Sequence, residues 1–62
     1  LGETSWKILE LMYNDENITI KRISEALNIS TTAVEKNIKQ LKKKGLLMYE
    51  GSARKGRWVI ID

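Results

Sequence analysis

Residues 28–46 read NISTTAVEKNIKQLKKKGL, and this stretch decides the fold. Apart from glycine, asparagine is the residue that best tolerates a left-handed backbone, so Asn28 can end one helix. Ser30 can then cap the next helix, which we expect from about residue 31 to residue 44. Gly45 is the type of residue that commonly follows a helix end. The stretch therefore predicts the end of one helix, a tight turn and a complete second helix.

The apolar residues of this second helix fall on one stripe. Val34, Ile38 and Leu41 follow one another at the i, i+4 and i+7 spacing of a helical face. This rotation directs the polar residues outward. The outward face is either an ordinary solvated surface or a surface that enters a groove of DNA.

Two further helices precede this one. Residues 20–27, IKRISEAL, form a short helix that Thr19 can cap. Residues 4–15, TSWKILELMYND, are helical by period, and Thr4 is the expected N-cap. The inward residues we expect from these two helices are Ser5, Ile8, Leu9, Met12, Ile20, Ile23 and Leu27.

After Gly45 the apolar period changes to two. Residues 46–50, LLMYE, and residues 57–61, RWVII, are typical of strands, and GSARKG joins them as a hairpin loop. One or two residues of strand can also form near Ile18. The predicted fold class is α+β, three helices followed by a hairpin. The core we expect consists of Ile8, Met12, Ile23, Leu27, Val34, Ile38, Leu41, Leu46, Trp58 and Ile60.

The first helix has more large apolar residues than one stripe needs. Trp6 and Tyr13 lie on one flank, and Leu11 lies on the other. We expect Trp6 and Tyr13 to cover the core beside the hairpin. The alternative is a surface for a homodimer or for other domains of a parent protein.

Composition excludes several functional classes. The 62 residues suit one small domain, and the first residue is Leu1, so we expect a domain cut from a longer protein. The absence of Cys and His excludes disulfides, zinc fingers and Cys or His nucleophiles. No group of residues suggests catalysis, a metal or a cofactor. GSARKGRW has the glycine spacing of a phosphate loop but lacks the following Lys and Ser/Thr, and a strand follows it.

The net charge of +3 is unevenly distributed. Residues 1–20 contain one lysine and four acidic residues, whereas residues 21–62 contain ten basic and four acidic residues. Such asymmetry favours one face for a polyanion, although a well-solvated surface also explains it.

The order of helices, turn and hairpin resembles the winged helix-turn-helix domain, and the resemblance covers nearly the whole chain. ITIKRISEALNISTTAVEKNIKQLKKKGLL looks like the bacterial and archaeal form, with Ser24 and Asn28 where Ala and Gly are usual. YEGSARKGRWVI resembles the wing of AlbA-type, Schlafen-like regulators that are related to RecG-type ATP-dependent DNA helicases. The resemblance implies a cytoplasmic module that binds double-stranded DNA and has no contact with membranes.

In that family the last helix enters the major groove and the wing lies beside it. The residues that the resemblance places at base edges are Ser30, Thr31, Thr32, Glu35, Lys36 and Lys39. Those expected at phosphates are Thr19, Lys21, Lys42, Lys43, Arg54, Lys55 and Arg57.

Each assignment has an ordinary structural alternative. Thr31 and Thr32 can compete for the helix cap, and Lys36 can be a solvated lysine. For Glu35 we favour an ion pair with Lys39, because Glu precedes Lys at the i, i+4 spacing. The lysines at 42–44 suit the helix dipole, but three in one turn favour attraction to phosphate. For the whole domain, the alternative is a protein-interaction or dimerisation module that does not bind specific DNA.

Overall fold

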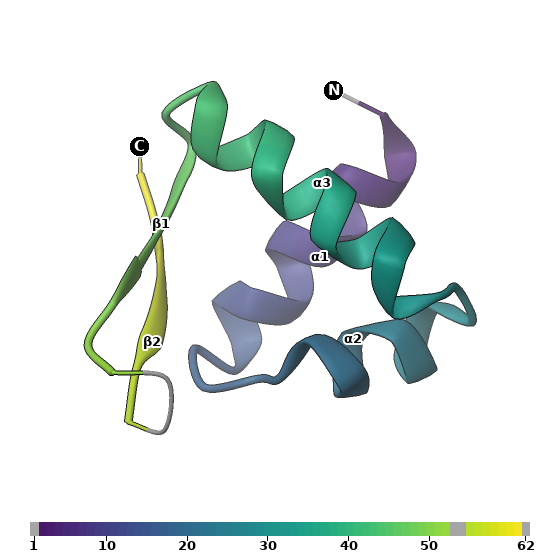
Figure 1. Ribbon diagram of the computed structural model, residues 1–62, viewed down its shortest axis with the longest axis horizontal. Helices are drawn as coiled ribbons and strands as arrows, with labels where there is room; N and C mark the ends of the chain where they lie inside the picture. Colours follow the sequence, from purple (N-terminus) through teal and green to yellow (C-terminus); the bar gives the residue numbers. More distant parts are fainter. Residues whose placement is uncertain (1, 53–54, 62) are drawn as a thin grey trace.

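The computed structural model of the protein describes residues 2–52 and 55–61. Within these residues three helices are followed by a two-stranded antiparallel hairpin, which confirms the predicted α+β winged-helix architecture. The hairpin lies across one end of the helices (Figure 1). The elements are α1 (Glu3–Asn14), α2 (Ile20–Leu27), α3 (Thr31–Lys43), β1 (Leu47–Glu50) and β2 (Arg57–Ile60).

The turn between α2 and α3 has the predicted geometry. Asn28 adopts a left-handed conformation with φ of 56°. The backbone N–H of Ile29 donates to the Ser24 carbonyl at 3.0 Å, which closes the end of α2. Ser30 then accepts a hydrogen bond from the Ala33 backbone N–H at 3.1 Å and caps α3. These contacts fix the angle between the two helices.

α1 packs against α3 through a small polar contact. Ser5 is buried in the predicted stripe, and its hydroxyl donates to Asn37 Oδ1 of α3 at 2.8 Å. The predicted N-cap, Thr4, is wrong, because α1 begins at Glu3 after Gly2. The Gly2 position makes no side-chain cap hydrogen bond, so the sequence has no capping residue there to recognise.

The core combines the helical stripes with the inner face of the hairpin. Leu9, which the helical period had already placed inward, and Leu47 belong to it in addition to the residues predicted for the core. Leu27, Leu46 and Ile60 were expected to be buried and are only partly so, packing at its edge. The buried apolar side chains are Ile8, Leu9, Met12, Ile23, Val34, Ile38, Leu41, Leu47 and Trp58.

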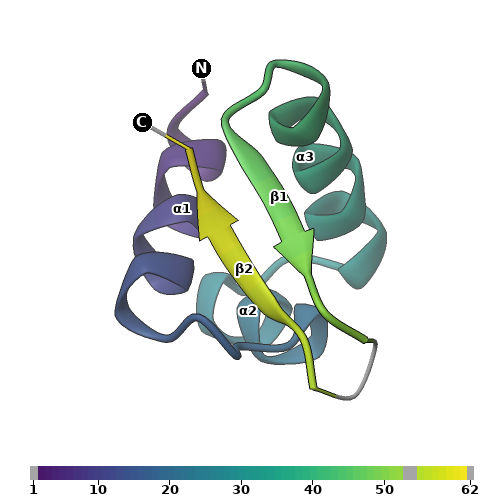
Figure 2. The ribbon, with the colours of Figure 1, turned by 90° about the vertical axis from the view of Figure 1, so that its left-hand side faces the viewer.

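The register of the hairpin explains why Leu47 is buried in place of Leu46. Leu47 pairs with Ile60, and Tyr49 pairs with Trp58. Residues opposite each other on antiparallel strands share a face. Because Trp58 points into the core, the whole set of four turns inward. Figure 2 shows the hairpin in front of the helices, with β2 beside α1 and β1 beside α3.

Leu46 instead takes part in the end of α3. Its backbone N–H donates to the Leu41 carbonyl at 3.0 Å, and the Gly45 N–H donates to the Lys42 carbonyl at 3.0 Å. Gly45 has φ of 74°, as the predicted helix stop requires. Leu46 therefore forms part of the turn that ends α3, and β1 begins one residue later.

The segment before α2 supports the hairpin without becoming a strand. Among the described residues no strand is present near Ile18. The Trp58 backbone N–H nevertheless donates to the Glu16 carbonyl at 2.8 Å, and the indole Nε1–H donates to the Ile18 carbonyl at 2.7 Å. Two hydrogen bonds from Trp58 therefore attach β2 to the α1–α2 loop.

Candidate nucleic-acid interface

The polar face of α3 is open to solvent. Thr31, Thr32, Glu35, Lys36 and Lys39 are all exposed, because the opposite face of the helix is buried in the core. The expected ion pair between Glu35 and Lys39 is absent from the ion pairs of the described residues, so that interpretation is wrong. These side chains are therefore available to a partner.

Two of the candidate hydroxyls already have a structural role. Ser30 caps α3, and the Thr19 hydroxyl accepts a hydrogen bond from the Arg22 backbone N–H at 3.1 Å, which caps α2. Both residues are exposed. A hydroxyl that accepts a hydrogen bond keeps its own proton to donate. Capping is thus compatible with a contact to a phosphate oxygen.

A hollow lies between α3, the start of α2 and the hairpin. It has a volume of about 500 Å³, and its lining includes Thr19, Ile20, Lys42 and Trp58. A second hollow of about 310 Å³ shares three of these residues and reaches Lys39 on α3. The two hollows form a concave surface between the helix and the wing, with lysines on its α3 side.

Trp58 forms the floor of this concave surface. Its ring packs edge-on against Tyr49, with 4.7 Å between ring centroids and 65° between the planes. The Lys42 Nζ lies 5.8 Å from the Trp58 ring centroid, within the range of a cation–π interaction. The sequence prediction considered phosphate and the helix dipole for Lys42 and did not foresee this contact, because the two residues are distant in the chain.

Of the basic residues in the wing sequence, the structure describes Lys55 and Arg57. Lys55 is exposed, and its backbone N–H donates to the Ser52 hydroxyl at 3.1 Å. The predicted phosphate contact of Arg54 lies outside the described residues. Within the part of the wing that is described, Lys55 is the basic side chain that the loop itself presents.

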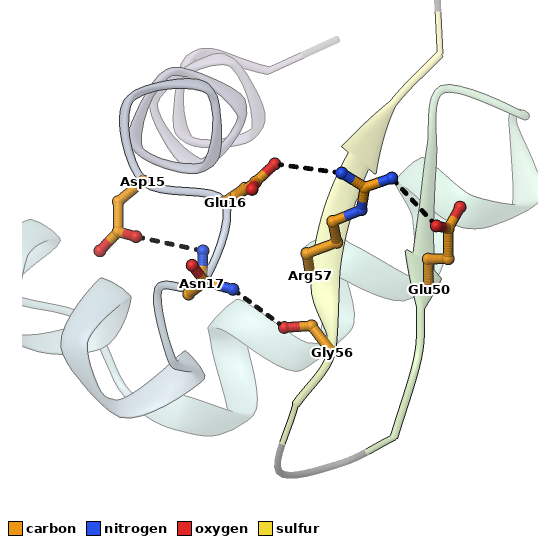
Figure 3. A network of polar contacts seen from close by, with 6 residues as sticks. All are labelled: Asp15, Glu16, Asn17, Glu50, Gly56 and Arg57. Atoms are coloured by element: carbon orange, nitrogen blue, oxygen red, sulfur yellow. Dashed lines mark hydrogen bonds and ion pairs between the residues drawn. The ribbon is translucent and has the colours of Figure 1, made fainter.

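Arg57, at the start of β2, has two carboxylate partners (Figure 3). Its Nη2 donates to Glu50 Oε1 at 3.0 Å, and its Nη1 lies 3.8 Å from Glu16 Oε2. The hydrogen bond to Glu50 and its charge, followed by the charge of Glu16, raise the pKa of the Arg57 guanidinium. The guanidinium that was expected at a phosphate is thus engaged by the protein itself.

The expectation that Trp6 and Tyr13 cover the core is wrong. Trp6 is 58% exposed and Tyr13 is 82% exposed. Leu11, on the other flank of α1, is partly buried against the core. The helical period placed the two aromatic residues on a flank of α1, and both remain exposed there.

Other kinds of site find no support in the part of the chain that the structure describes. There, no three His, Cys, Asp or Glu residues are grouped so that they could hold a metal ion. None of the described helices has the length and apolar character needed to cross a membrane.

Comparisons with known proteins agree with this geometry. A family model described as winged helix-turn-helix DNA-binding matches residues 1–48. The solved structure of a MarR/EmrR family transcriptional regulator from Acinetobacter sp. ADP1 is similar, with a TM-score of 0.84 and 22% identity. The match covers 100% of this chain and 46% of that regulator. No curated protein sequence matches the chain. None of these matches concerns the AlbA/Schlafen-like or RecG-related proteins that the wing resembles.

Proposed function

Because the chain belongs to the winged helix-turn-helix DNA-binding family, we propose that it binds double-stranded DNA with α3 in the major groove and the hairpin as a wing. The observation that carries this proposal is the exposed polar face of α3 beside a concave, lysine-lined surface. The second helix of a helix-turn-helix enters the major groove with its N-terminal residues toward base edges. The domain itself acts as a binding module without catalysis.

The N-terminal half of α3 supplies the base contacts in this proposal. Hydroxyls of Thr31 and Thr32 can bond to bases, and Lys36 can reach guanine. Glu35 has no ion-pair partner among the described residues and can accept a hydrogen bond from the amino group of cytosine. The complete set of proposed base-contacting residues is Ser30, Thr31, Thr32, Glu35, Lys36 and Lys39.

The phosphate contacts come from the rim of the concave surface and from the wing. The proposed residues carry a positive charge or a hydroxyl that can meet the backbone of either strand. Arg57 is left out of the proposed set because Glu16 and Glu50 hold its guanidinium. The proposed residues are Thr19, Lys21, Lys42, Lys43, Arg54 and Lys55.

A specificity measurement tests the role of α3. Thr32→Ala and Lys36→Ala should weaken binding to a preferred duplex, selected from a random pool, more than binding to a mixed-sequence duplex. A direct base contact contributes about 1–3 kcal/mol of discrimination. Calorimetry or a gel-shift assay measures the affinity of each variant for the two duplexes. Equal losses on both duplexes would assign the two side chains to phosphates, and no loss on either would contradict the proposal.

The salt dependence of binding tests the wing. If Arg54 and Lys55 each neutralise one phosphate, Arg54→Ala/Lys55→Ala should reduce the slope of log K against log salt by about 2. Affinity should fall for all sequences alike, while the melting temperature stays close to that of the parent domain. An unchanged slope would contradict the wing assignment.

A second candidate function is protein interaction or dimerisation. The exposure of Trp6 and Tyr13 favours it, since large aromatic side chains are enriched in interfaces. The two functions are compatible if a dimer presents two α3 helices to DNA. Measuring the oligomeric state of Trp6→Ala/Tyr13→Ala beside the parent domain tests this candidate.

In a longer protein, the domain would direct the rest of the chain to DNA. The similar solved structure is a transcriptional regulator, which favours the same role for the parent of this domain. The resemblance of the wing sequence leaves a helicase-related parent as the narrower alternative.

A further inference from the structure

We infer that Arg57 is a positioning residue for DNA binding, one that fixes the wing against the α1–α2 loop and makes no phosphate contact itself. The inference rests on the proposed function, because it concerns how the wing is presented to DNA. The structural basis is a set of contacts that we call the Arg57 network, formed by Glu16, Arg57 and Glu50 (Figure 3).

The Arg57 network joins three parts of the chain. Glu16 belongs to the α1–α2 loop, Glu50 ends β1, and Arg57 begins β2. One guanidinium nitrogen faces each carboxylate, at 3.8 Å for Glu16 and 3.0 Å for Glu50. Arginine suits this position because its planar fork presents separate N–H donors to two partners. The network therefore links the two strands to each other at the base of the wing and links the wing to the α1–α2 loop.

Neighbouring hydrogen bonds act in the same direction. Asn17 Nδ2 donates to the Gly56 carbonyl at 3.2 Å, and the Trp58 backbone N–H donates to the Glu16 carbonyl at 2.8 Å. Asp15 Oδ1 accepts a hydrogen bond from the Asn17 backbone N–H at 3.1 Å and shapes the loop. Gly56 and Trp58, the residues on both sides of Arg57 in the sequence, are thus bonded to this loop, so the network completes an attachment at the base of the wing.

The charges around Arg57 argue against a direct phosphate contact. Its positive charge is shared between two carboxylates, and each carboxylate would repel a phosphate that approached the guanidinium. A wing held in its bound orientation before DNA arrives loses less conformational entropy on binding. The network favours binding in this way although two of its three members are acidic.

Whether Kd rises or falls when a carboxylate of the network is removed tests the inference. Removal of an acidic charge from a DNA-binding protein ordinarily strengthens its attraction to phosphates. Glu16→Gln should instead raise Kd for a mixed-sequence duplex about two- to fivefold, the range expected for loss of an exposed ion pair. Glu10→Gln is the matched control, because Glu10 is exposed on α1 and forms none of the ion pairs among the described residues. It should not raise Kd.

A charge-conserving substitution gives the second test. Arg57→Lys keeps the positive charge but cannot present a fork to both carboxylates. We expect Kd to rise about two- to fivefold with an unchanged salt slope, since no phosphate contact is lost. Circular dichroism at the assay temperature checks that each variant is folded.

The outcomes separate this inference from the proposed function. If the parent chain shows no affinity for duplex DNA, the proposed function fails. If the parent binds but Glu16→Gln, like the control, does not raise Kd, the positioning role is wrong. A parent-like Kd for Arg57→Lys, or a slope for Arg57→Gln that falls by about 1, would assign Arg57 to phosphate and overturn the inference.

Discussion

α3 and the hairpin rest on the same core but are attached to it by different kinds of contact. α3 buries Val34, Ile38 and Leu41 completely or nearly so. The hairpin buries Leu47 and most of Trp58, packs Tyr49 and Ile60 partly against the core, and adds hydrogen bonds and one ion pair to the α1–α2 loop. The helix is therefore held by apolar burial, whereas the wing combines apolar burial with directional polar contacts.

This difference matters for the two parts that the proposed function assigns to DNA. Apolar burial depends little on salt, whereas exposed ion pairs weaken as salt screens them. A side chain can be removed from the polar face of α3 without disturbing its buried face. At the base of the wing, the same residues that face the solvent also hold the hairpin in place. The following three predictions test this comparison, from the largest effect to the smallest.

The largest expected effect is at the buried face of α3. Ile38→Ala should reduce the free energy of unfolding by about 2–5 kcal/mol, because it removes buried methyl groups and leaves a cavity. Urea denaturation followed by circular dichroism measures the loss. Lys43→Ala, on the exposed side of the same helix, is the control and should change stability by less than about 0.5 kcal/mol. Equal stabilities for the two variants would mean that α3 is rotated from the orientation described.

A smaller effect is expected at Gly56, where the wing loop packs against a side chain of β1. A methyl group on Gly56 would collide with the ring of Tyr49, which is itself packed against Trp58. Gly56→Ala should therefore cost about 1–3 kcal/mol, as overpacked sites do. Gly2→Ala is the control for the added carbon, since apart from its chain neighbours no heavy atom lies within 4 Å there, and it should lose only the small N-cap advantage of glycine over alanine. Thermal melting of both variants decides whether the wing is as closely packed as described.

The smallest effect concerns one polar attachment of the hairpin. Trp58→Phe keeps an aromatic ring but removes the N–H that donates to the Ile18 carbonyl. Loss of this hydrogen bond should lower stability by about 0.5–1.5 kcal/mol, and the smaller buried ring adds to that loss. Trp6→Phe changes an exposed ring and should leave the urea midpoint where it is. If both variants match the parent, the indole hydrogen bond contributes nothing and the wing is less dependent on polar contacts than we describe.

Local signals in the sequence were sufficient to predict most of the fold. Thr19, Asn28, Ser30 and Gly45 each act on the backbone within a few residues of their own position, and each has the predicted role. The helical period also gave the correct rotation of α3, and with it the exposed polar face. These features could be predicted because each depends on residues that are close together in the sequence.

Two incorrect predictions are local, the Thr4 cap and the Glu35–Lys39 ion pair, and most of the others depend on contacts between distant residues. The register of the hairpin, which buries Leu47 instead of Leu46, is set by the pairing with β2. The exposure of Trp6 and Tyr13 depends on how the other elements pack over α1. The attachment of Arg57 to Glu16 joins residues from opposite ends of the chain, and no spacing rule connects them. At the candidate interface, sequence reasoning found the exposed side chains but missed the contacts that orient the wing.

The two tryptophans differ in burial, so the intrinsic fluorescence of the domain can report on two of its surfaces. Trp58 is 9% exposed at the floor of the concave surface, whereas Trp6 is 58% exposed on α1. We expect Trp58 to emit at shorter wavelength and to resist quenching by acrylamide, and Trp6 to emit at longer wavelength and to be quenched readily. DNA bound over the concave surface should alter the Trp58 emission, and a protein docked on α1 should shield Trp6. Light emitted by the unlabelled domain can therefore report which of its two surfaces is occupied.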